Sequence, residues 1–195
     1  MKRLAAAALL FAAACTAGAQ DLDRPLLLVA APDLQGMYNR TALLVVPAAG
    51  GQHFGFILNR ATEVRMGTLF PEHAPSAKVA EPVFFGGPEM LGSIFAIVPH
   101  DPGGPALHLF GELYVTANGA AVDRIIEKTP NEARYFAGFV GWERGELEKE
   151  IGAGFWYLTE PDAALLFRKD TGGMWEELVK RLRSRSAALT SSAVL

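Results

Sequence analysis

Short apolar segments rich in β-forming residues, separated by glycine and proline turns, constrain the fold most strongly. Helical periodicity is confined to the second half of the chain, so strands and helices do not alternate regularly. This order argues against parallel βαβ units and predicts an α+β fold with antiparallel connections. Strands are predicted at 26–30, 41–46, 54–58, 83–85, 93–98, 112–116, 133–142 and 155–158, and helices at 121–128, 143–151 and 175–182.

The composition indicates one globular domain. Half of the 195 residues are hydrophobic, which excludes a disordered chain, and the net charge of -3 gives no basic footprint for nucleic acid. Because no linker interrupts the pattern, we predict a single domain at 20–183 and a disordered tail at 184–195, where small polar residues dominate.

The first nineteen residues have the layout of a secretory signal peptide. Lys2 and Arg3 precede an apolar run too short to span a bilayer, and Ala17-Gly18-Ala19 forms a cleavage site. Removing this leader changes the net charge from -3 to -5, which weighs further against a nucleic-acid partner. We therefore expect export, with the periplasm as destination.

The single cysteine, Cys15, lies inside the leader. If Cys15 carried a lipid, the protein would be anchored to a membrane, but the aliphatic residue usual three positions before such a cysteine is missing. If the segment were instead an ordinary N-terminal helix, the protein would be cytoplasmic.

Familiar catalytic motifs are missing from the sequence. The four histidines, at 53, 73, 100 and 108, form no close ligand pair, so we expect no metal and no cofactor. Ser93 follows a glycine but lacks the second glycine of a hydrolase elbow, and no phosphate-binding loop occurs.

Three polar or glycine-rich clusters remain as candidates for a ligand site. Asn59-Arg60, with Asn39-Arg40, can hold an anion, although ordinary turn chemistry is the simpler explanation of each pair taken alone. The Gly-Gly-Pro turn at 86–88 allows close approach of a ligand or of another loop. The segment 138–148 contains a strand-to-helix corner whose carboxylates suit either acid–base chemistry or a helix N-terminus. The predicted ligand-binding residues are Asn59, Arg60, Gly86, Gly87, Trp142, Glu146 and Glu148.

In this order, the three clusters resemble the AlgH/YqgE family of bacterial proteins. The resemblance covers roughly residues 25–182 and is most specific in the Gly-Trp-x-x-Gly-x-Leu-Glu motif at 141–148. It implies a compact, mostly antiparallel β-sandwich or barrel-like sheet flanked by a few helices, and a late tryptophan, Trp175, that opens the last helix. Two departures stand out, because Ala61 replaces the family's proline and Glu146 its glutamine.

The family has no established reaction, so the resemblance implies no catalytic residues. We favour an exported, non-enzymatic module that binds a small ligand or a protein partner. One alternative is a cytosolic, transcription-related regulator of the alginate type. Another is an unrecognised hydrolase that uses Glu146 or Glu148 as acid or base.

Overall fold

The computed structural model describes residues 21–192. The predicted leader at 1–19, with Cys15, and the last three residues of the predicted tail lie outside the described residues. No described helix is long and apolar enough to cross a membrane.

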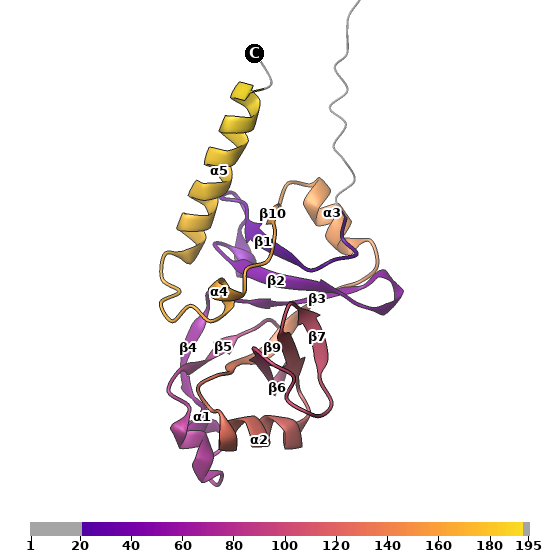
Figure 1. The fold of residues 1–195 in the computed structure, drawn as a ribbon. Helices are drawn as coiled ribbons and strands as arrows, with labels where there is room; N and C mark the ends of the chain where they lie inside the picture. Colours follow the sequence, from indigo (N-terminus) through magenta and orange to yellow (C-terminus); the bar gives the residue numbers. More distant parts are fainter. Residues whose placement is uncertain (1–20, 193–195) are drawn as a thin grey trace, which may run out of the picture.

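Within residues 21–192, ten strands form one sheet that curls on itself (Figure 1). The order is β10-β1-β2-β3-β9-β6-β8-β7, and β4 joins through β5, which pairs with β9. The α+β prediction and the mostly antiparallel sheet are confirmed, with one parallel pairing, β5 on β9. The strands are β1 (Leu26–Ala30), β2 (Ala42–Pro47), β3 (His53–Ile57), β4 (Ala61–Arg65), β5 (Pro82–Phe85), β6 (Glu89–Val98), β7 (Leu107–Phe110), β8 (Leu113–Thr116), β9 (Arg134–Trp142) and β10 (Trp156–Thr159).

The helices flank the curled sheet. In Figure 1, α1 and α2 lie below the sheet, whereas α3 and α5 lie above it. The apolar stripe predicted for 121–128 is buried, since Val122, Ile125 and Ile126 pack into the core. The helices are α1 (Met66–Leu69), α2 (Gly119–Lys128), α3 (Glu146–Gly152), α4 (Ala163–Leu166) and α5 (Met174–Ser192), with 3-10 turns at Gly36–Tyr38, Ala49–Gly51 and Ala74–Lys78.

Strand β9 connects the part of the sheet formed by β10, β1, β2 and β3 with the part formed by β6, β8 and β7. On one side it pairs with β6, and on the other it pairs first with β5 and then, near its end, with β3. The Gly-Gly-Pro turn at 86–88 crosses β9 backbone against backbone. A Cβ atom at Gly86 would lie 2.2 Å from the carbonyl oxygen of Gly138, and one at Gly87 would lie 2.2 Å from the carbonyl carbon of Phe139. Only glycine permits this approach. It brings two of the candidate clusters from the sequence together, the turn at 86–88 and the segment 138–148.

The long-range contacts of α5 fix its first half to the sheet. Met174 and Leu178 are fully buried in the main core, and the indole Nε1 of Trp175 donates to the carbonyl oxygen of Ala30 at 2.8 Å. The prediction that Trp175 lies at the start of the last helix is thereby confirmed.

The tail prediction needs correction, because α5 continues through residues 184–192 to Ser192. Those positions contain no glycine or proline, so a helix nucleated by the packed first half can extend through them. The sequence analysis also did not predict β4, β7, α1 and α4. Strand β4 is mostly exposed and shows no apolar alternation, and each of the two helices has only four residues.

Candidate functional site

A pocket of about 740 Å³ opens between the β2–β3 hairpin, the end of β9 and the strands β6 to β8. This volume falls in the range of roughly 300–1,000 Å³ that is typical of small-molecule sites. The lining residues are Ala48, Gln52, His53, Phe54, Glu89, Phe95, Leu107, Val115, Ala117, Phe139, Gly141, Trp142, Glu143 and Glu146.

Three phenylalanines from three strands contribute to the apolar part of the lining. The ring of Phe139 makes edge contacts with Phe54 and Phe95, with centroids 6.4 Å and 5.6 Å away. Gly141 lies opposite Phe54 in the sheet and is itself a lining residue. A Cβ atom there would be 3.5 Å from the Phe139 ring and 3.9 Å from Cγ of Glu89, which are ordinary contacts. The missing side chain at Gly141 therefore leaves the pocket open, and the backbone does not require glycine.

Carboxylates line the polar side of the pocket. The amide Nε2 of Gln52 donates to Oε2 of Glu143 at 2.7 Å, and the backbone N–H of Glu143 donates to Oε2 of Glu146 at 2.9 Å. Within the described residues, the exposed carboxylate of Glu89 has no hydrogen-bond or ion-pair partner. No lysine or arginine lines this pocket, so its lining is negatively charged.

The corner between β9 and α3 places two of these carboxylates. Strand β9 ends at Trp142, and Gly145 takes the left-handed conformation with φ of 79°, which turns the chain into α3 at Glu146. Glu146 and Glu148 both lie in the first turn of α3, as the sequence predicted.

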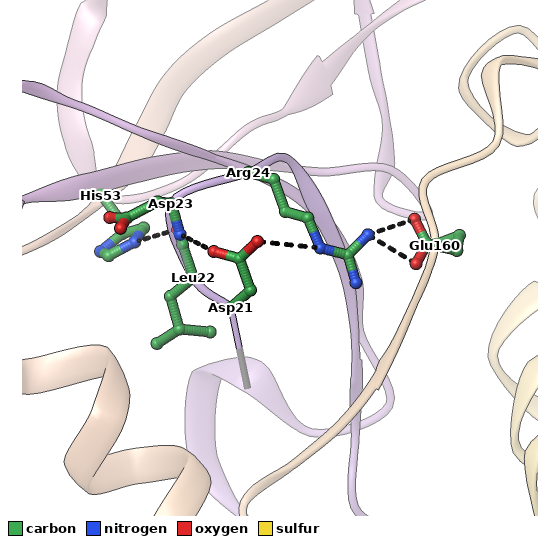
Figure 2. A network of polar contacts seen from close by, with 6 residues as sticks. All are labelled: Asp21, Leu22, Asp23, Arg24, His53 and Glu160. Atoms are coloured by element: carbon green, nitrogen blue, oxygen red, sulfur yellow. Dashed lines mark hydrogen bonds and ion pairs between the residues drawn. The ribbon is translucent and has the colours of Figure 1, made fainter. Parts of the chain in front are cut away.

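His53 joins the pocket to the first described segment of the chain (Figure 2). The side chain is buried, and its Nε2 lies 3.0 Å from the carbonyl oxygen of Leu22. Because a carbonyl oxygen only accepts, Nε2 carries the proton, and in the neutral ring Nδ1 then presents a lone pair. Among the described residues, Nδ1 has no hydrogen-bond partner. Nearby, Arg24 holds both carboxylate oxygens of Glu160, at 2.5 and 2.6 Å, which ties this segment to the end of β10.

One carboxylate oxygen fixes the wall of the pocket from behind. The indole Nε1 atoms of Trp142 and Trp156 both donate to Oε2 of Glu150, at 2.9 and 2.7 Å. Both tryptophans are buried, and Tyr38 contacts the Trp156 ring edge-on at 6.0 Å. Glu150 of α3 thus ties the end of β9 to the start of β10.

Two predicted site residues, Arg60 and Glu146, affect the pKa of the Tyr38 hydroxyl group. Burial raises the pKa of the Tyr38 hydroxyl, and the negative charges of Glu150, Glu89 and Glu146 raise it further, while Arg60 lowers it. Arg60 and Glu146, which lie far apart in the sequence, are therefore close enough in space to influence one hydroxyl group.

The Asn59-Arg60 pair has mainly backbone partners. The Oδ1 atom of Asn59 accepts from the N–H of Ala42 at 3.0 Å, and its Nδ2 donates to the carbonyl oxygen of Arg40 at 2.9 Å. Arg60 donates to the carbonyl oxygen of Asn39 at 3.2 Å, and burial lowers its pKa. These contacts hold the end of β3 to the start of β2.

The structure divides the seven predicted site residues into two groups. Trp142 and Glu146 line the pocket, whereas the remaining five are not among its lining residues: Asn59, Arg60, Gly86, Gly87 and Glu148. A ligand-binding role for all seven stays a prediction. Sequence reasoning did not select Gln52, Phe54, Phe95 or Leu107, and it gave His53 no role. Glu143 lies inside the candidate segment 138–148, and Glu89 follows the turn at 86–88, but neither was among the seven predicted residues. The pairing of His53 with Trp142 across β3 and β9 joins residues too far apart in sequence for local patterns to reveal.

Among residues 21–192, no group of three or more His, Cys, Asp or Glu side chains is arranged to hold a metal ion.

Comparisons with known proteins identify the family to which this fold and its motifs belong. Residues 27–187 match the family model described as AlgH-like. The chain belongs to the AlgH-like family. Relatives named only "UPF0301 protein" include one from Chlorobium limicola, 30% identical with 82% of this chain and 87% of the relative covered. Another, from Chlamydia trachomatis, is 27% identical with 87% and 92% covered.

Two solved structures share the AlgH-like fold. The solution structure of the AlgH protein from Pseudomonas aeruginosa superposes with a TM-score of 0.69 at 23% identity, covering 81% of this chain and 87% of that one. The crystal structure of protein DIP2367 from Corynebacterium diphtheriae superposes with a TM-score of 0.67 at 22% identity, covering 83% and 88%. At these identities the likeness establishes the fold alone.

Proposed function

We propose that this AlgH-like protein is a non-enzymatic binding module that takes a small ligand in the 740 Å³ pocket. The observation that carries the proposal is the combination of a phenylalanine-lined interior with a few polar groups at one side. Ligand pockets typically combine apolar walls with a few polar groups that orient the ligand.

The composition of the pocket favours binding over hydrolysis. Its lining contains no serine, threonine, cysteine or lysine that could serve as a nucleophile. Of the two carboxylates in the hydrolase alternative, only Glu146 lines the pocket, and one of its oxygen atoms has a structural role as the acceptor of the Glu143 N–H at the start of α3. Glu148, the other, is exposed and outside the lining.

Binding is tested with Nile red, a neutral dye whose fluorescence rises in apolar surroundings. We expect the purified protein to bind it, and Gly141→Leu to weaken binding at least about tenfold because the new side chain would enter the pocket. Gly119→Leu is the matched control, since a Cβ atom at that glycine meets nothing within 4 Å. If the protein did not bind Nile red, or if folded Gly141→Leu bound it as well as the control, the proposal would be wrong.

The second part of the proposal is export with cleavage after Ala19. The support is the leader pattern at 1–19 together with the anchoring of the next segment, because cleavage there would leave the contacts of Leu22 and Arg24 intact. Mass spectrometry of the native N-terminus tests this. A chain that starts at Gln20 is expected, a lipid on Cys15 would favour the membrane-anchored form, and an intact Met1 would favour the cytosolic regulator.

A further inference from the structure

The hydrogen-bonding character of the pocket is one-sided. Most of the unused hydrogen-bonding capacity of the lining side chains belongs to acceptors, the carboxylates of Glu89, Glu143 and Glu146. The only side-chain amide in the lining, that of Gln52, uses one of its two N–H groups on Glu143. A ligand that satisfies the carboxylates must therefore supply hydrogen-bond donors.

The charge of the pocket adds a second requirement. Three carboxylates line it, and no lysine or arginine in the lining balances them. The partners of Glu143 and Glu146 are a neutral amide and a backbone N–H, so neither contact cancels the negative charge. Positive charge on the ligand is therefore favoured, and negative charge is opposed.

The aromatic rings set the rest of the ligand. Phe54, Phe95 and Phe139 offer ring surfaces that bury hydrocarbon, and a cation near a ring face gains additional attraction. A small hydrophilic cation would leave this surface uncovered.

We propose that the pocket binds a small primary ammonium compound whose charged group lies between the Glu89 and Glu143 side chains and whose apolar body lies on the phenylalanines. This assignment rests on the proposed binding function and names the ligand class for the same pocket. It selects a primary ammonium over a quaternary one, because only the former has N–H donors for the acceptors described above.

The test uses four probes with one common body: 4-phenylbutylamine, 4-phenylbutanol, 4-phenylbutyrate and 4-phenylbutyltrimethylammonium. Each competes with Nile red at low salt, where charge effects are least screened. The primary amine is expected to bind most tightly, about tenfold or more better than the carboxylate, with the alcohol between them.

Glu89→Gln is the decisive variant, because this exposed side chain has no contact on which the fold depends. It should weaken binding of the amine about two- to fivefold and leave binding of the alcohol unchanged. Glu63→Gln removes the same charge from an exposed position on β4, outside the lining, and should change neither.

Each outcome tests a different part of the proposal. Equal binding of the amine and the carboxylate, or an equal loss for the amine and the alcohol in Glu89→Gln, would overturn the ligand class while Nile red binding upholds the pocket. Tighter binding of the trimethylammonium probe than of the primary amine would overturn the choice of a primary ammonium. Failure of Nile red itself to bind would instead refute the proposed function.

Discussion

Replacing Glu150 by alanine removes the acceptor shared by two buried indole groups. In the structure, Nε1 of Trp142 and Nε1 of Trp156 lie 2.9 and 2.7 Å from the same carboxylate oxygen. A hydrogen bond to a charged group contributes about 1.5–3 kcal/mol. Because water can enter the space that the half-buried side chain leaves, we take the lower figure for each bond. The expected loss in the free energy of unfolding is about 3 kcal/mol, or a decrease in Tm of about 6–12 °C for a domain of this size.

Urea and thermal unfolding, followed by tryptophan fluorescence, measure this loss. Glu150→Gln retains an acceptor oxygen without the charge and should lie between alanine and the wild type. Lys149→Ala changes an exposed residue on the same helix and should stay within about 0.5 kcal/mol. A loss below about 1 kcal/mol for Glu150→Ala would show that the two indole contacts do not hold β9 and β10 together.

Three further substitutions test other contacts. Arg134→Met should cost about 2–4 kcal/mol in urea unfolding, because the buried guanidinium donates to Glu81 at 3.0 and 3.2 Å and to a backbone carbonyl oxygen at 2.7 Å; a neutral effect would contradict this. Gly86→Ala should destabilise by more than about 3 kcal/mol or prevent folding, whereas Gly92→Ala, with open space around it, should stay within about 1 kcal/mol. Burial raises the pKa of Tyr135 above its ordinary value of 10.0, so the unfolded chain loses this proton first and stability should fall as the pH rises above 10. Tyr135→Phe should reduce that alkaline decline by up to about 1.4 kcal/mol per pH unit, and equal pH profiles would refute the assignment.

Local sequence patterns predicted the elements that are buried or strongly periodic. The run at 26–30 is a fully buried strand, and the stripe on α2 is buried as its spacing required. Strand β4 escaped prediction because its residues are mostly exposed, so no side of it is selected for apolar residues. The end of α5 was mispredicted because small polar residues indicate disorder only where no packed helix precedes them.

The pocket could not be predicted to the same extent, because its lining comes from segments far apart in sequence. Phe54 and Gly141 meet only through the register of β3 on β9, and Phe95 reaches them through β6 on β9. Two of the motif residues that carried the family resemblance, Asn59 and Gly86, have a structural role and do not line the pocket. They secure backbone contacts that hold the curled sheet, and a motif of this kind identifies a fold more readily than a ligand.

Glu146 is the position where the architecture and the proposed specificity meet. Its Oε2 atom accepts the N–H of Glu143 and thereby fixes the corner at which α3 begins. A glutamine, the residue expected from the family pattern, can make the same bond through its amide oxygen, so this contact does not require the charge. What the glutamate adds is a third negative charge in the pocket lining. The substitution therefore leaves the corner contact available and changes the electrostatics of the pocket, which makes ligand charge the property in which AlgH-like proteins with glutamine here should differ from this one.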